Sequence, residues 1–243
     1  MGPPALPKLQ RRRDSHLRLK LNMKNPKLLI VSGFHGDERG VISSVKRAVK
    51  KYHDALLPFF FIPEVSPSAI RLGTRFNKNK ADLNRSFFDD SSVEEVRLLI
   101  KKVLPYKFDV CISFHEDPEY SDFYLYDAYG ENLEGSHLLQ NLRSRIKSLN
   151  VGLLNGIDDP QDPTLGITFH EGYHYFPPVH ENKDGFFSDW AFTKGVIKRY
   201  LNPEIPGKLD QIRKDKLVEI LFNQLLVIPP SAQTQEYEPS NQF

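Results

Sequence analysis

The stretch KLLIVSGFHGDERG (residues 27–40) joins an apolar run to a glycine-containing turn that carries charged and titratable side chains. The run at 27–32 has the length of a buried β-strand, and it ends at Gly33. His35 and Glu38 follow, three residues apart, where this strand gives way to the next segment. The spacing fits two ligands of one metal ion, and it also fits an acidic side chain that favours a helix N-terminus.

Apolar runs alternate with amphipathic segments along the rest of the chain. The runs predict strands at 57–63, 108–114 and 123–127, and the periodic segments predict helices at 38–52, 91–103, 135–149 and 209–227. In the helix expected at 91–103, Ser91 and Glu94 have the spacing of a capping box. The alternation predicts an α/β domain built around a largely parallel, buried sheet.

Composition and charge narrow the class of protein. The chain has 243 residues, of which 33 are basic and 31 acidic, so the formal net charge is only +2. This balance favours a globular protein without a nucleic-acid partner. Cys111 is the one cysteine in the sequence, which fits a reducing compartment. Because no apolar run approaches about 18 residues, we expect a cytoplasmic protein that does not bind membranes.

The two ends of the chain differ in composition from its centre. Residues 1–20 are basic and contain several prolines, which indicates a basic N-terminal arm. Residues 229–243 are polar and indicate a C-terminal tail. One folded domain is therefore expected at 21–228.

Two of the predicted strands end in histidine. The first runs to Gly33 and His35, and the strand at 108–114 runs directly into His115. Ligands of open α/β sheets gather at the carboxyl ends of the strands. His35, His115 and Glu38 could therefore form the set of two histidines and one glutamate that catalytic zinc commonly takes. The alternative is that His115 is a buried histidine of the core and that Glu38 serves a helix N-terminus.

A polar segment between a strand and a helix adds a second group of candidates. The stretch TRFNKNKADLNRSF (74–87) contains four residues of interest, which are Arg75, Asp82, Asn84 and Arg85. Asparagine beside arginine can clamp a carboxylate, because the guanidinium fork binds two oxygens and the amide adds a donor. The alternative is a solvated basic loop, and this is the better interpretation of the NKNK residues themselves.

Three of these stretches together, SGFHGDERG, DLNRSF and CISFHED, resemble the zinc metallocarboxypeptidase superfamily. That superfamily includes carboxypeptidase A-like exopeptidases and the succinylglutamate desuccinylase/aspartoacylase branch. The resemblance implies a single α/β domain with a central, mostly parallel mixed sheet flanked by helices. It also implies one zinc ion per chain, bound by His35, Glu38 and His115. Asp82 would support a zinc-binding histidine, as carboxylates commonly do.

The resemblance also assigns the groups that act on the substrate. It implies that Asn84 and Arg85 bind a substrate carboxylate and that Arg75 polarises the scissile carbonyl. The family needs a late glutamate as general base, and the stretch GFFSDWAFTKGVIKRYLNPEIPGKLD (185–210) places it at Glu204. Three other acidic residues are rivals for this function: Glu116, Glu171 and Glu181. Glu116 would point away from the ligands, because side chains alternate along a strand.

The resemblance, together with the candidate metal set and clamp, implies a zinc-dependent hydrolase that cleaves an amide bond next to a free carboxylate, such as a metallocarboxypeptidase. Its substrate would be a peptide or an N-acyl amino acid. The alternatives are an N-acyl amino acid deacylase on the same scaffold and a non-catalytic module that binds carboxylates. Some features depart from the family pattern, including Ser66-Pro67-Ser68-Ala69 after the second predicted strand. Pro203 precedes the expected base within a strand, where proline is unusual, and only 76 residues separate Glu38 from His115.

Overall fold

The computed structural model describes residues 25–159 and 166–227. The predicted N-terminal arm (1–20) and C-terminal tail (229–243) lie outside the described residues. Within the described ranges, none of the helices combines the length and the apolar character needed to cross a membrane.

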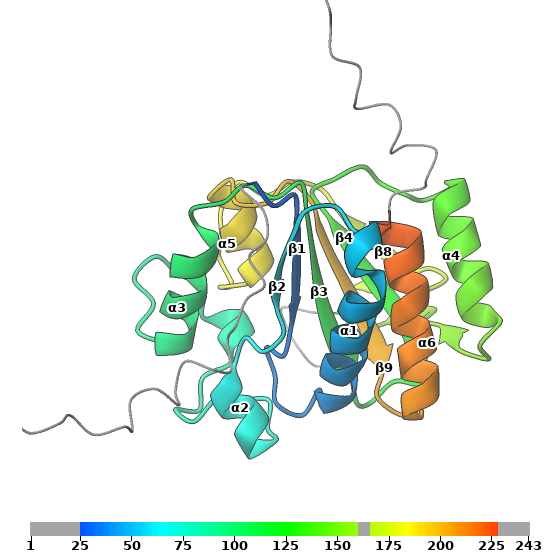
Figure 1. Cartoon of the computed structure of the whole chain (residues 1–243), viewed down its shortest axis with the longest axis horizontal. Helices are drawn as coiled ribbons and strands as arrows, with labels where there is room; N and C mark the ends of the chain where they lie inside the picture. Colours follow the sequence, from blue (N-terminus) through cyan, green and yellow to red (C-terminus); the bar gives the residue numbers. More distant parts are fainter. Residues whose placement is uncertain (1–24, 160–165, 228–243) are drawn as a thin grey trace, which may run out of the picture.

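One seven-stranded sheet runs through the molecule (Figure 1). Its strands are β1 (Leu28–Ser32), β2 (Phe59–Ile62), β3 (Val110–Asp117), β4 (Asp122–Ala128), β5 (Gly152–Leu153), β8 (Tyr173–Phe176) and β9 (Tyr200–Pro206). The order is β2-β1-β3-β9-β4-β5, and β8 pairs with β4. Every pair is parallel except β4 with β9, which is antiparallel. The predicted α/β fold with a mostly parallel mixed sheet is therefore confirmed.

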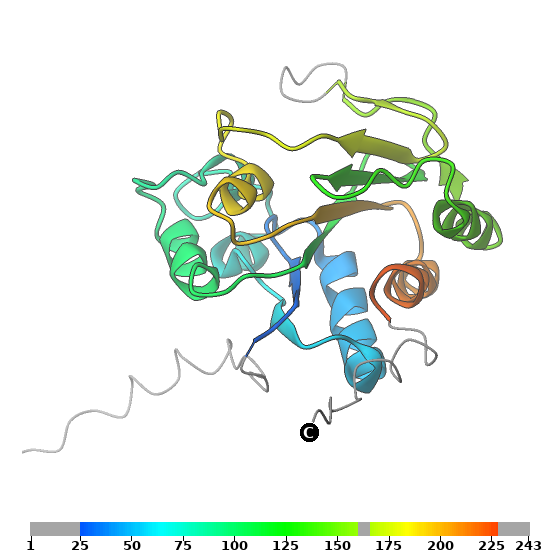
Figure 2. The same ribbon diagram turned by 90° about the horizontal axis from the view of Figure 1, so that it is seen from above.

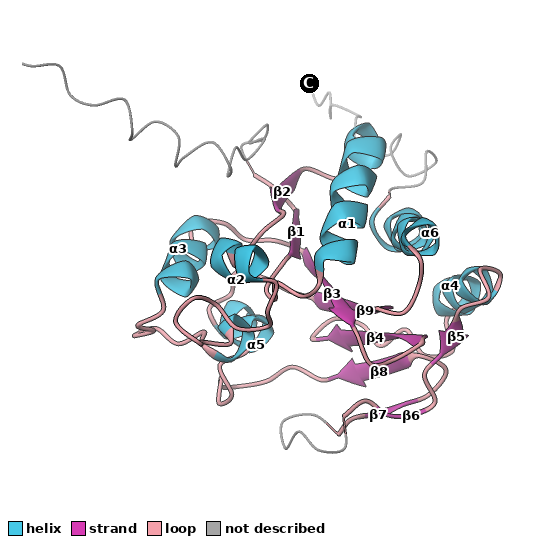
Figure 3. Ribbon diagram, turned by 90° about the horizontal axis from the view of Figure 1, so that it is seen from below, coloured by secondary structure: helices cyan, strands magenta, loops and turns pink. Residues whose placement is uncertain are grey.

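Helices cover both faces of the sheet (Figures 2 and 3). One face packs against α1 (Arg39–Tyr52), α4 (His137–Lys147) and α6 (Gln211–Leu221). The other packs against α3 (Glu94–Val103) and α5 (Phe187–Thr193). The short helix α2 (Pro67–Leu72) follows β2, a 3₁₀ turn spans Leu83–Arg85, and β6 (Gly156–Ile157) pairs with β7 (Thr168–Phe169) in a separate ribbon.

The apolar run that opens the sequence forms β1 because both faces of this strand are covered. All five of its residues are buried. Leu28 and Ile30 pack toward α1 and α6, and Leu29 and Val31 pack toward α3 and α5. A continuous apolar run is the pattern of a strand buried on both sides.

The capping box predicted at the start of α3 is wrong. The helix begins at Glu94 after the N-cap Val93, and Val93 makes no side-chain cap. The Ser91 hydroxyl instead accepts a hydrogen bond from the Val93 amide at 3.4 Å, in the turn before the helix. The spacing is that of a capping box, but the N-cap is Val93, two residues after the Ser91 that the box requires.

Pro203 lies in the interior strand β9, between β3 and β4. The parallel ladder pairs Cys111 and Ile112 with the first two residues of β9, and it resumes where His115 pairs with Glu204. The interruption falls beside Pro203, which has no N–H to donate. The strand therefore tolerates proline because one neighbour gives up its pairing at this level.

Candidate active site

The ends of three adjacent strands meet at one edge of the sheet, beside the start of α1 (Figure 1). Strand β1 leads into the turn that carries His35, β3 carries His115, and β9 carries Glu204. In the register of β3 with β9, His115 lies directly opposite Glu204. Paired residues of neighbouring strands share a face, so these side chains lie on the same side of the sheet.

The turn after β1 depends on glycine. Gly33 has a φ of +72°, in the left-handed region that glycine adopts without strain. At Gly36, a Cβ atom would lie 1.9 Å from the carbonyl oxygen of Ala69 in α2. The turn can therefore pass directly against the backbone of α2, and this path carries His35 to the sheet edge.

His35, Glu38 and His115 converge and are buried. The Nδ1 atom of His35 lies 2.5 Å from Glu38 Oε1, and the Nδ1 atom of His115 lies 3.2 Å from the same oxygen. One ligand atom from each residue falls within 4.8 Å of the others. The three side chains are only 3–6% exposed. The structure thus brings together the three residues that the sequence assigns to the metal.

The outer nitrogens of both histidines have partners of their own. His35 Nε2 lies 3.3 Å from Asp82 Oδ1, and His115 Nε2 lies 3.1 Å from the Ser113 hydroxyl. Such contacts fix the ring orientation and leave Nδ1 as the inward nitrogen. Ser113 is not among the residues predicted from the sequence. The sequence feature that could have identified it is its position two residues before His115, which places both side chains on the same face of the strand.

The Glu38 carboxylate does not cap helix α1, although Glu38 is the N-cap residue. Instead, the Val41 amide donates to Glu116 Oε2 at 2.7 Å. Glu38 Oε2 is buried without a hydrogen-bond partner. An orphaned carboxylate oxygen beside two inward-facing imidazole nitrogens fits the donor set of a zinc ion. The helix-terminus interpretation of Glu38 is therefore not supported.

Strong electrostatic coupling marks the cluster. Burial opposes protonation of His35, but Glu38 and Asp82 outweigh it and raise the pKa of His35 to about 9. Burial likewise opposes ionisation of Glu38, but His115 and His35 outweigh it and lower the pKa of Glu38 to about 2. The ionised carboxylate of Glu38 is therefore buried next to the protonated imidazole of His35. A divalent cation would take the place of that proton.

Asp82 links the cluster to the polar segment after α2. Its carboxylate accepts from Arg75 Nε at 2.9 Å and from the backbone N–H of Asn84 at 2.9 Å. Arg75 is 43% exposed, so part of its guanidinium faces solvent at the rim of the site. The interpretation of 74–87 as a merely solvated loop holds for Lys78 and Lys80, which are exposed, but not for Asp82.

Asn84 and Arg85 are anchored on the segment that leads into α5. The Asn84 side-chain oxygen accepts from the Phe187 amide at 3.2 Å. The Arg85 guanidinium lies over the ring of Phe186, 4.2 Å from its centroid, and donates to the Asn84 carbonyl at 3.1 Å. The residues of the predicted clamp are thus held in place from two sides, by Asp82 and by the start of α5.

Glu204 shares the strand face of His115, whereas its three rivals lie elsewhere. Glu116 points to the opposite face, as the alternation along β3 predicts, and pairs with Lys214. Glu171 pairs with Lys147 and Glu181 with Lys183, both in surface ion pairs. Burial and the charges of Glu38 and Asp117 raise the pKa of Glu204 well above its usual range.

Asn202 lies two residues before Glu204 on the same face, and the sequence analysis did not identify it. Its amide nitrogen donates to Glu204 Oε1 at 3.3 Å. On the far side of β9, Tyr124 of β4 lies opposite Glu204. The Tyr124 hydroxyl donates to Asp117. The candidate base is thus flanked by polar groups from both neighbouring strands.

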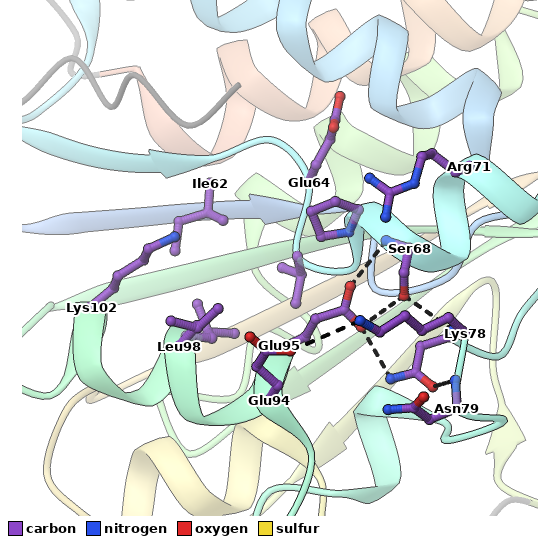
Figure 4. A pocket seen from close by; sticks show the side chains of 14 residues that line it. Ile62, Glu64, Ser68, Arg71, Lys78, Asn79, Glu94, Glu95, Leu98 and Lys102 are labelled. Atoms are coloured by element: carbon purple, nitrogen blue, oxygen red, sulfur yellow. Dashed lines mark hydrogen bonds and ion pairs between the residues drawn. The ribbon is translucent and has the colours of Figure 1, made fainter. Parts of the chain in front are cut away.

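A separate cavity of about 190 Å³ lies between α2, α3 and the loop at 77–79 (Figure 4). None of the predicted site residues lines it. The Glu95 carboxylate at its wall accepts from the Ser68 amide and hydroxyl and from Asn77. This network ties α2 to the loop beyond it, and so fixes the start of the segment that carries Asp82.

Known proteins resemble this chain in a short stretch of sequence and in the fold. No family model matches the sequence. Over 63 residues the chain is 40% identical to murein peptide amidase A of Vibrio campbellii, a match that covers 26% of this chain and a quarter (25%) of that protein's length.

Solved structures match over most of the described fold. A candidate metallopeptidase from Shewanella amazonensis superposes with a TM-score of 0.66 at 20% identity, over 84% of this chain and 77% of that one. A candidate carboxypeptidase A from Shewanella denitrificans gives a TM-score of 0.54 at 15% identity, over 81% and 55% of the two chains. The chain has the metallocarboxypeptidase fold. An aspartoacylase family protein from Mesorhizobium loti reaches 0.50 at 22% identity, over 84% and 59%.

The coupling of His35 to its acidic neighbours predicts that zinc binding releases a proton. Because the pKa of His35 is about 9, its ring carries a proton at pH 7.5 in the metal-free protein. A ligating histidine must be neutral, so zinc affinity should rise with pH and level off above about 9. Calorimetric titration of zinc in two buffers with different ionisation enthalpies should show release of roughly one proton per zinc bound. Heats that do not depend on the buffer would contradict this assignment.

Proposed function

We propose that the protein is a zinc-dependent hydrolase that cleaves an amide bond next to a free carboxylate, in the manner of a metallocarboxypeptidase. The observation that carries the proposal is the convergence of His35, Glu38 and His115. The Nδ1 atoms of the two histidines meet the buried carboxylate of Glu38, whose Oε2 atom has no hydrogen-bond partner. Peptides with a free C-terminus are the proposed substrates.

The three converging residues would hold the zinc ion. When bound, zinc would supply Lewis acidity that makes water nucleophilic near neutral pH. Asp82 and Ser113 would keep the two imidazole rings in the orientation that ligation requires. The ring of Phe34 stacks on His115 with centroids 5.5 Å apart and is fully buried, so it excludes water from one side of the cluster.

Glu204 is the proposed general base. It would take a proton from the attacking water and later give that proton to the leaving amine. A raised pKa suits both halves of this cycle, since proton transfer is most efficient when the pKa of the group lies near the working pH. The hydrogen bond from Asn202 to one carboxylate oxygen would orient the other toward the water.

The substrate would be positioned by groups on the polar segment that carries Asp82. Asn84 and Arg85 would bind the free carboxylate, and this contact would set which amide bond lies beside Glu204. Arg75 would stabilise the oxyanion that develops on the scissile carbonyl. To do so it would have to share its guanidinium between the substrate and Asp82.

An N-acyl amino acid deacylase is the second candidate. The likeness to the aspartoacylase family protein and the short connection between Glu38 and His115 favour it. Hydrolysis assays with C-terminal peptides, N-acetyl amino acids and N-succinyl amino acids would separate the two activities. Zinc-loaded protein that cleaves none of them would favour a non-catalytic module that binds carboxylates.

Replacement of the clamp arginine tests substrate positioning. Arg85→Ala should raise KM strongly while zinc content stays at one per chain, because a clamp on a carboxylate acts mainly through binding. Amidation of the substrate carboxylate should have the same effect on the unaltered protein. If the unaltered protein cleaves amidated and free substrates equally well, the clamp is misassigned.

Replacement of the candidate base tests the mechanism. Glu204→Gln preserves the shape of the side chain and removes its basicity, so kcat should fall by roughly 10²- to 10⁴-fold with zinc retained. Glu171→Gln and Glu181→Gln are matched controls on the surface and should keep normal turnover. Near-normal turnover in Glu204→Gln together with a loss in one of the controls would show that another residue is the base.

A further inference from the structure

A buried ion pair lies behind the candidate metal cluster, on the opposite face of β3. Lys214 of α6 donates to Glu116 Oε1 at 2.6 Å, and the two side chains are only 9% and 10% exposed. Lys214 also donates to the carbonyl oxygen of Gly207 at 2.8 Å, directly after β9. The second oxygen of Glu116 accepts from the Val41 amide in the first turn of α1. None of the functions assigned above uses this pair.

We propose that the Glu116–Lys214 pair is a positioning device for the metal ligands. Because Glu116 of β3 accepts a hydrogen bond from the first turn of α1, the carboxylate of Glu38 stays directed at the metal. This inference rests on the proposed function, because it assumes that the three converging residues bind zinc.

The first step of the argument concerns the helix terminus. The first amides of a helix have no partner within it, and the N-cap side chain commonly accepts from one of them. Glu38 occupies the N-cap position of α1, and Val41 stands three residues later. Val41 is fully buried, so its amide needs a protein acceptor. Without Glu116, the carboxylate that the helix position favours for that amide would be Glu38, because an N-cap side chain commonly accepts from the amide three residues later.

The second step concerns the space that the first turn of α1 leaves for Glu116. A Cβ atom on Gly40 would lie 2.8 Å from Glu116 Oε2 and 3.1 Å from Lys214 Nζ. Glycine at this position is therefore what admits the ion pair against the helix. The approach is too close for any other residue without displacement of the carboxylate.

The third step concerns what the pair joins. Glu116 is the neighbour of the candidate ligand His115, and the alternation of side chains along β3 sends the two to opposite faces. Lys214 ties the same carboxylate to the end of β9, the strand of Glu204. One buried contact therefore links the segments that carry Glu38, His115 and Glu204. Groups outside the ligand set that orient ligands commonly account for 10- to 100-fold of metal affinity.

Zinc affinity, measured by competition with a chromophoric chelator, tests the proposal in the full chain. Glu116→Ala should weaken zinc binding by roughly 10- to 100-fold. It should also change the visible absorption spectrum of the cobalt-substituted protein, because Glu38 turns from the metal to the helix. Glu116→Gln keeps an oxygen for the Val41 amide and should recover most of the affinity. Lys214→Met should give an intermediate loss.

Asp127→Asn is the matched control. It weakens a second ion pair, in which Arg199 Nε donates at 2.9 Å to the buried carboxylate of Asp127, away from the cluster. Its thermal stability should fall while zinc affinity and the cobalt spectrum stay unchanged. If Glu116→Ala does not fold, Gly40→Ala provides the same test, since its methyl group would displace the Glu116 carboxylate.

The outcomes separate this proposal from the proposed function. Unaltered protein that binds zinc tightly, with Glu116→Ala and Gly40→Ala equal to it in affinity and cobalt spectrum, would overturn the positioning proposal alone. An equal loss of affinity in Asp127→Asn would overturn it too, because the effect would then follow general destabilisation. Unaltered protein that takes up no zinc would overturn both proposals.

Discussion

The parallel pairing of β1 and β9 with β3 is the constraint on which the rest of the candidate site depends. Parallel strands end at the same edge of a sheet, so residues in or just after the last positions of β1, β3 and β9 must meet there. His35, His115 and Glu204 are far apart along the chain, yet the register of these three strands leaves them side by side. The sheet thus brings these residues to one edge, and the glycine-containing turn after β1 and the neighbouring helices then set their exact positions.

The converging side chains concentrate negative charge in a buried cluster. The cluster buries the Glu38 carboxylate and places Asp82 and Glu204 near it. Protonated His35 supplies a compensating charge next to Glu38 when no metal ion is bound. A divalent cation neutralises the acidic groups better than one proton does, and it can use the Glu38 oxygen that no donor satisfies. The same substitution of a cation for a proton underlies the predicted dependence of zinc affinity on pH.

The sequence predicts the parts of the structure that local pattern determines. The fully buried strand β1 and the amphipathic helix α1 follow from periodicity, and the fold class follows from their alternation with similar segments. The capping box at Ser91 fails because tertiary structure decides where α3 begins. Ser113 and Asn202 escape sequence reasoning for a related reason. Each matters only through a neighbour two residues away on a strand face, and no local pattern marks that relationship as functional.

The alternation of side chains along β3 gives one dipeptide two uses. His115 faces the candidate metal cluster, and Glu116 faces the first turn of α1. The sequence shows the opposite orientations of the two residues, but it cannot show that the terminus of a helix formed 77 residues earlier lies against the second one. Because Glu116 accepts from the Val41 amide, the N-cap residue Glu38 need not accept a hydrogen bond from the first turn of α1. The sequence left two functions open for Glu38, that of a metal ligand and that of an acid at a helix terminus. The proposed arrangement divides these functions between two residues. In the proposed site, Glu38 would keep the first function, and Glu116 would take the second.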